Sequence, residues 1–286
     1  MSQEHTQKII EWHQKEVDDE YVRKSGDDLV YDKITWDNIE PFLPLEGLIL
    51  DAGGGAGIWS LKMAEKRRRM VVLLDITLDL LEVAKQKIYN EQTPGHIEVL
   101  NADIRALPHP ESSFDFILCE ADPICICGNP EKAISEFSRV IKNKGYLIAG
   151  IDSTFYRVFH ALSQGKSLDS ILDFLQTGIA PPEDDAGVDV VTAGFPFESK
   201  SFTPREFIIL LKKYHLETVK IVGKPLGFRQ GILDSFVSVI PTEKRHRIFK
   251  DLKEKRKLAQ ILHLIYEDPY IAGIGSHLQV VAKKTN

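Results

Sequence analysis

The 286-residue sequence contains no hydrophobic run long enough to span a membrane, and its first residues lack the apolar segment of a secretion signal. It has only three cysteines, an odd number that gives no disulfide framework. It also lacks a basic excess, since 36 Lys and Arg stand against 42 Asp and Glu, for a net charge of −6. These absences predict a cytoplasmic protein that binds neither membranes nor nucleic acid.

A glycine-rich stretch at residues 49–57 is the most informative part of the sequence. A short apolar run ends there in an acid, and glycines follow at alternate positions: Asp51, then Gly53, Gly55 and Gly57. The pattern predicts a buried strand that turns tightly into a helix and presents backbone N–H groups, as nucleotide sites do. The dinucleotide spacing G-x-G-x-x-G would need glycine where Ile58 stands, so that spacing is absent.

Two further apolar runs lead to acidic residues. Residues 70–74 end at Asp75, a carboxylate suited to accept hydrogen bonds from a ribose diol. Thr77 is then expected to cap a helix over residues 78–89. A third strand over residues 97–100 leads to Asp103. Farther along, Asn129 and Thr203 are each placed to cap a helix, the latter through a capping box with Glu206.

The pattern D-x-G-x-G-x-G resembles the first motif of the class I (Rossmann-like) S-adenosylmethionine-dependent methyltransferases, and the chain looks like the small-molecule "type 11"-like subgroup. Residues 107–118 are similar to the passage that leads into the fourth strand of many small-molecule methyltransferases. Residues 203–206 resemble a helix start of the same family. The family's L-K-P-G-G turn is replaced by residues 141–145, which keep one glycine. The resemblance covers residues 45–150 well and later elements more loosely.

The resemblance implies S-adenosylmethionine as the cofactor and no metal. In the family, the glycines pass under the methionine part of the cofactor, the second acid binds ribose, and the third accepts from the adenine amino group. The cofactor-binding residues it implies are Asp51, Gly53, Gly55, Gly57, Asp75, Ile76, Asp103, Ile104 and Glu120. Glu120, on the loop after the fourth strand, is also the candidate catalytic residue, with Asp122 the other acid nearby.

We expect an α/β fold: a doubly wound, seven-stranded, mostly parallel sheet with an antiparallel last strand and helical lid insertions. The binding core is expected over residues 31–150, its continuation over 203–223 and its last strand over 275–286. Three segments are expected to cover the carboxyl edge of the sheet: 1–30, with a helix through Ile9, Ile10 and Val17, then 151–202 and 224–274. Stabilising decoration or an oligomer interface is the alternative for these segments.

The expected reaction is methyl transfer to an oxygen, nitrogen or sulfur atom of a small-molecule acceptor in a lidded pocket. Two alternatives stay open: a non-methyl reaction of the same cofactor (aminocarboxypropyl transfer or cyclisation), and a nonenzymatic S-adenosylmethionine-binding protein. Cys119, Cys125 and Cys127 follow the fourth strand closely. Small buried packing residues are the first interpretation of these cysteines, and a thiol trap for a soft metal is the second.

Overall fold

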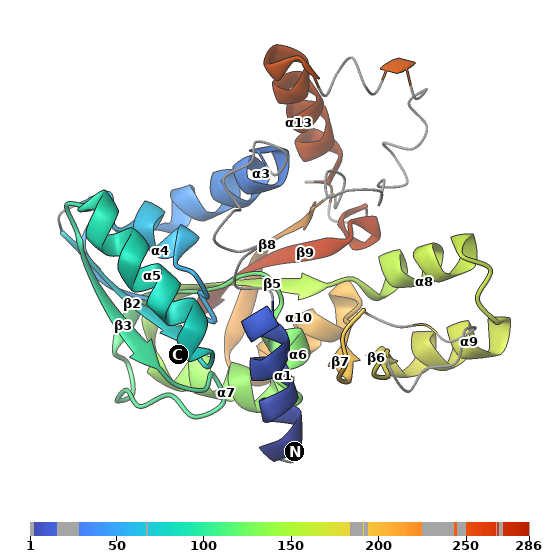
Figure 1. Cartoon of the computed structure of the whole chain (residues 1–286), viewed down its shortest axis with the longest axis horizontal. Coiled ribbons are helices and arrows are strands. Elements are labelled where there is room, and N and C mark those ends of the chain that lie inside the picture. The colour runs from blue at the N-terminus through green and yellow to red at the C-terminus, as the bar shows by residue number, and fades with distance from the viewer. Residues whose placement is uncertain are drawn as a thin grey trace.

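A seven-stranded sheet forms the centre of the computed structural model (Figure 1). The structure describes residues 3–15, 29–66, 68–183, 191, 194–224, 243–244, 250–266, 268 and 271–285. Its strands are β1 Gly47–Ala52, β2 Arg69–Asp75, β3 His96–Asn101, β4 Phe114–Cys119, β5 Ile141–Asp152, β8 Leu216–Lys224 and β9 His277–Lys284. They lie in the order β3-β2-β1-β4-β5-β9-β8. Strands β1 to β5 pair in parallel, and β9 is antiparallel to both neighbours, which confirms the predicted sheet.

Helices cover both faces of the sheet because the side chains of each strand alternate between two apolar cores. On β1, Leu50 packs in the cluster that contains Phe137 of α7, whereas Ile49 packs in the cluster that contains Met63 of α4. The helices next to the sheet are α3 Leu29–Ile39, α4 Ile58–Met63, α5 Leu78–Glu91, α7 Pro130–Val140 and α10 Pro204–Lys213. The fold is therefore doubly wound, as predicted.

Two of the three predicted helix caps are confirmed. The side chain of Asn129 accepts from the backbone of Lys132, and Thr203 forms a capping box with Glu206. Thr77 occupies the cap position of α5, but its hydroxyl makes no capping bond, so that prediction was wrong.

Residues 141–145, which replace the family's L-K-P-G-G turn, form the first part of β5. Strand β5 begins at Ile141, directly after α7. Lys144 has φ 66°, a left-handed conformation that glycine adopts more easily. A lysine therefore stands at a position in this segment where the backbone conformation favours glycine.

Further segments lie beyond the carboxyl ends of the parallel strands (Figure 1). Helix α1 (Gln3–Lys15) hydrogen-bonds through His5 to the carbonyl of Ile126 and through Gln14 to Asp79. Its partners lie in α6 (Pro123–Ile126), after β4, and at the start of α5, after β2. Helices α8 (Thr154–Ser163) and α9 (Leu168–Thr177) follow β5, and a two-stranded ribbon joins β6 (Ile179–Ala180) to β7 (Ser199–Lys200).

The predicted cover is only partly described. Helix α13 (Leu252–Tyr266) and a 3-10 turn over Ala272–Ile274 belong to the second insertion. Val17 and most of residues 224–274 lie outside the described residues. None of the described helices combines the length and the hydropathy needed to cross a membrane.

Candidate cofactor and acceptor site

The glycine turn after β1 has the backbone conformation that its sequence predicts. Gly53, Gly55 and Gly57 have φ values of 74°, 51° and 80°, a region that side chains disfavour. A Cβ on Gly53 would lie 2.5 Å from Cγ of Pro123. A Cβ on Gly55 would meet only Leu80 within 4 Å, with Cδ1 at 3.6 Å. Gly53 therefore allows the turn to pack on α6, whereas Gly55 leaves open space above the turn.

Asp51, at the end of β1, is a buried carboxylate with an unsatisfied oxygen. Its Oδ2 accepts a 2.6 Å hydrogen bond from Ser60 Oγ, while its buried Oδ1 has no hydrogen-bond partner among the described residues. Burial raises the pKa of Asp51 to about 7, and repulsion from Asp75 and Glu120 adds to the shift. A positively charged or hydrogen-donating ligand would stabilise this carboxylate.

Asp75, at the end of β2, is tied to the glycine turn. Its Oδ2 accepts from the backbone of Gly55 at 2.9 Å, and its Oδ1 accepts from the backbone of Thr77 at 2.8 Å. Burial raises the pKa of Asp75, and these hydrogen bonds offset only part of the shift. Ile76 follows and packs beside Trp12 of α1. The structure thus brings Asp51, the glycine turn and Asp75 together.

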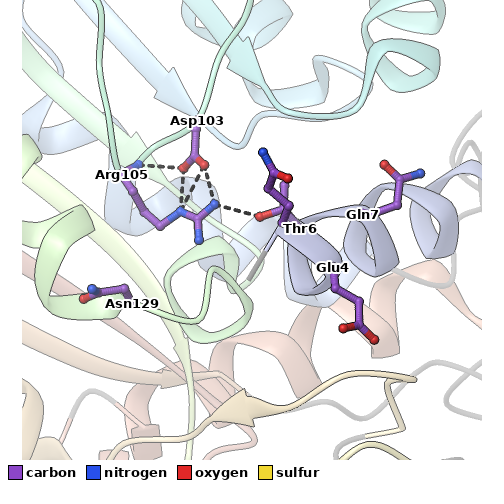
Figure 2. A pocket seen from close by; sticks show the side chains of 7 residues that line it. Glu4, Thr6, Gln7, Asp103, Arg105 and Asn129 are labelled. Atoms are coloured by element: carbon purple, nitrogen blue, oxygen red, sulfur yellow. Dashed lines mark hydrogen bonds and ion pairs between the residues drawn. The ribbon is translucent and has the colours of Figure 1, made fainter. Parts of the chain in front are cut away.

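A polar cavity of about 810 Å³ lies between α1 and the loop after β3 (Figure 2). Both carboxylate oxygens of Asp103 bind the guanidinium of Arg105, with Nε 2.9 Å from Oδ1. Arg105 also donates to Thr6 Oγ1 of α1 at 3.0 Å. Burial would raise the pKa of Asp103, but the bonds from Arg105 outweigh it and hold the pKa below its ordinary value. Ile104 packs in the core cluster on the α7 side of the sheet.

Glu120 lies just after β4 in a buried ion pair. Its Oε1 binds Nζ of Lys224, the last residue of β8, and its Oε2 accepts from Nε2 of Gln279 on β9 at 2.9 Å. Lys224 is fully buried. A Cβ on Gly150 would lie 2.8 Å from Glu120 Oε1, so glycine makes room for the carboxylate. The sequence predicted Glu120 at this edge of the sheet, but no local sequence pattern identified Lys224 as its partner.

A second ion pair joins Asp122 to His277, the first residue of β9. Asp122 Oδ2 lies 2.6 Å from His277 Nε2, and Asp122 Oδ1 is buried without a partner. Burial would raise the pKa of Asp122 and lower that of His277, but their opposite charges outweigh it and shift both pKa values the other way. A third pair, Arg157 Nε to Asp152 Oδ2 at 2.6 Å, lies at the end of β5.

These three charge pairs meet because their strands are neighbours. In the sheet register, His277 lies opposite both Asp152 and Lys224. Sequence reasoning did not select His277, since a histidine at the start of a strand carries no signal until its neighbours are known. The carboxyl edge of the sheet therefore carries paired charges drawn from β4, β5, β8 and β9.

The three cysteines behave as packing residues. All are buried, Cys127 Sγ donates to the carbonyl of Ile124, and Cys125 Sγ accepts from the backbone of Asp152. Burial raises the pKa of each thiol, that of Cys127 to about 11. The described part of the chain contains no group of three or more His, Cys, Asp or Glu side chains suited to hold a metal ion. These contacts favour the packing interpretation over the thiol trap.

Comparisons with known proteins agree with this geometry. Residues 49–145 match the family model described as "Methyltransferase domain". Two curated relatives are named ubiquinone/menaquinone biosynthesis C-methyltransferase UbiE. The one from Francisella tularensis subsp. novicida is 33% identical over 102 residues, and the one from Pseudoalteromonas translucida is 30% identical over 102 residues. Each match covers 35% of this chain and 40% of the relative, so it spans about two fifths of the relatives' length.

Two solved structures share the fold over most of the chain. A SAM-dependent methyltransferase from Methanosarcina mazei aligns with TM-score 0.58 and 21% identity, over 86% of this chain and 96% of that one. The [4+2]-cyclase SpnF aligns with TM-score 0.52 and 16% identity, over 91% of this chain and 81% of that one. The fold is therefore shared by proteins named for different reactions.

Proposed function

We propose that this chain, whose core domain belongs to the class I S-adenosylmethionine-dependent methyltransferases, transfers the methyl group of that cofactor to a small-molecule acceptor. The observation that carries the proposal is Asp51, a buried carboxylate beside the glycine turn with one unsatisfied oxygen and a pKa raised to about 7. A cofactor with a sulfonium and an ammonium group would supply the missing positive charge. A dinucleotide would instead place its pyrophosphate at the glycine turn, near the Asp51 carboxylate, where like charges repel.

The residues that would hold the cofactor are those the family resemblance implies. Gly53, Gly55 and Gly57 would lie under its methionine part, with Asp51 and Glu120 nearby. Asp75 and Ile76 would contact the ribose, and Asp103 and Ile104 the adenine. Asp103 already accepts hydrogen bonds from Arg105 at both oxygens, two at each, so an adenine amino group would share this carboxylate with Arg105. The bound cofactor would supply an activated methyl group.

The chain itself would supply alignment of the acceptor and exclusion of water. Methyl transfer from a sulfonium is an in-line displacement, so most of the rate can come from orientation and exclusion of water. An acceptor with an O–H or N–H group also needs a proton acceptor. Both oxygens of Glu120 are engaged by Lys224 and Gln279, which favours a positioning role for Glu120. Nε2 of His277 is engaged by Asp122, whose charge raises the pKa of the ring, so we propose a positioning role for His277 as well.

We also propose that the segments 1–30, 151–202 and 224–274 form a lid over the acceptor pocket. The contacts of α1 with α5 and α6 support this for the first segment. The curated relatives are named C-methyltransferases, so carbon joins oxygen, nitrogen and sulfur as a candidate acceptor atom. A cytoplasmic location, and the absence of nucleic-acid and membrane partners, belong to the same proposal.

The test combines binding with product analysis. The purified chain is titrated with S-adenosylhomocysteine and with NAD by calorimetry, and then incubated with methyl-labelled S-adenosylmethionine and fractionated metabolite extracts. We expect S-adenosylhomocysteine to bind, NAD not to bind, and label to enter a small molecule while S-adenosylhomocysteine accumulates. Release of methylthioadenosine would identify aminocarboxypropyl transfer instead. Binding without turnover across the extracts would favour a nonenzymatic binding protein, and binding of NAD alone would refute the proposal.

A further inference from the structure

The hairpin of α8 and α9 projects from the sheet at the end of β5 (Figure 1). Its two helices pack against each other through a small buried cluster that includes Ala161, Ile171 and Phe174. Four residues, 164–167, connect the helices, so they run antiparallel. The inner faces of the hairpin are thus already covered by its own side chains.

The hairpin carries a second set of large apolar side chains that are exposed in the part of the chain that the structure describes. On α8 they are Phe155, Phe159 and Leu162, and on α9 they are Leu168, Leu172 and Leu175. Each set follows the spacing i, i+4, i+7, which places its members on one side of a helix. Their side chains are 38–68% exposed. With Ile179 they present roughly 600 Å² of apolar surface, at the upper end of what a monomer normally exposes.

We propose that this apolar face is the interface of a homodimer, formed by α8 and α9 of two copies. Two such faces would bury roughly 1,200 Å² together, which reaches the size of stable protein interfaces. Antiparallel helix pairs with apolar stripes of this spacing pack face to face as a four-helix bundle. The same patch on both copies gives a closed two-fold dimer.

The charges of the hairpin favour a second copy over a lipid surface. Segments that lie on anionic membranes carry clustered Lys and Arg on the flanks of their apolar face. Here α9 carries Asp169 and Asp173, and Arg157 of α8 is already paired with Asp152. Lys166, in the connecting loop, adds a single basic group. The whole chain has a net charge of −6, which anionic lipid would repel.

Dimer formation would restrain the hairpin next to the edge of the sheet where the charge pairs lie. Helix α8 begins two residues after Asp152, and Arg157 of α8 binds that carboxylate. Fixing the outer face of α8 against a second copy would therefore limit movement of the hairpin relative to β5. This inference does not depend on the proposed methyl transfer.

The test is sedimentation velocity of the full chain from about 1 to about 100 µM. We expect a dimer for the wild type, and a monomer for the double variant Leu168→Glu/Leu172→Glu with its affinity for S-adenosylhomocysteine changed less than about threefold. The control is Tyr89→Glu, which places one glutamate at an exposed apolar site on α5 and should leave the dimer intact. In the wild type, hydrogen exchange of α8 and α9 should also slow as the concentration rises, a readout that does not need a stable variant.

Three outcomes would overturn the inference. A wild-type monomer over the whole concentration range would show that the face does not pair. A dimer that persists in the double variant would place the interface elsewhere. Cosedimentation of the monomeric wild type with phosphatidylglycerol vesicles, lost in the double variant, would assign the face to a membrane surface.

Discussion

Replacing Asp51 with Asn should stabilise the cofactor-free protein, and the gain should increase with pH. Asp51 is buried, and burial raises its pKa from 3.8 to about 7. A carboxyl with a raised folded-state pKa binds more protons folded than unfolded between these two values, so it lowers stability as pH rises through that window. Asn removes the charge and keeps an oxygen that accepts from Ser60 Oγ.

The size of this effect follows from the pKa shift. One pKa unit corresponds to about 1.4 kcal/mol, so the ionised carboxylate costs about 4 kcal/mol above pH 8 and about 1.6 kcal/mol near pH 5. The stabilisation by Asp51→Asn should therefore grow by about 2–3 kcal/mol between these conditions, or about 4 °C in Tm for a chain of this length. Cofactor affinity should fall, because the substitution removes the charge that a cationic ligand would pair with.

Urea denaturation at about pH 5 and about pH 8.5 measures the change, with m-values checked for two-state behaviour. The control is Asp37→Asn on α3, where the carboxylate is partly exposed and pairs with Lys33. The change in unfolding free energy that this substitution causes should differ little between the two pH values. An equal gain at both pH values, or a loss of stability at the higher one, would refute the argument that desolvation of Asp51 dominates.

Three further predictions concern the turn and the charge pairs. Gly55→Val should cost about 1–3 kcal/mol, because a β-branched side chain is strained at φ 51°, but should leave the chain folded, because little among the described residues lies within reach of the new Cβ. It should cut S-adenosylhomocysteine affinity at least about tenfold in calorimetry, and normal binding would remove the turn from the site. Lys224→Met should lower the stability measured in thermal denaturation by about 3–5 kcal/mol, because it leaves Glu120 buried and unpaired. Adding Glu120→Gln should restore most of the lost stability. If it restores none, the pair does not set the stability. Asp122→Asn should lower the pKa of His277 in an NMR titration, because it removes the largest of the interactions that oppose burial and leaves only the charge of Asp152. It should also remove most of the stability that the protonated wild-type histidine contributes below its raised pKa, and an unchanged pKa would contradict the ion pair.

The sequence predicted those features that depend on neighbouring residues. Buried parallel strands are continuous apolar runs, so β1, β2 and β4 were visible, and the alternating glycines predicted the left-handed turn. The caps at Asn129 and Thr203 also follow from local patterns. Thr77 failed because Asp75, two residues earlier, accepts from the backbone of Thr77 while its hydroxyl stays unpaired.

The charge pairs could not be predicted, because they depend on which strands become neighbours. Glu120 and Lys224 are 104 residues apart in sequence, and Asp122 and His277 are 155 apart. Only the insertion of β9 between β5 and β8 brings them together. A single sequence shows each as an isolated polar residue. The exposed apolar face of α8 and α9 could not be predicted either, since the inner and outer apolar residues differ only in what packs on them.

The position of β9 also sets the order in which a growing chain can fold. Strand β5 ends at Asp152, but its outer neighbour begins at His277, 125 residues later. At ordinary rates of synthesis those residues take roughly 6 to 25 seconds to emerge from the ribosome. During that time the edge of β5 stays open to other strands, and Glu120 and Asp122 wait without their counter-charges. The site is therefore completed by the last described strand to be made, and a nascent chain needs protection from aggregation until then.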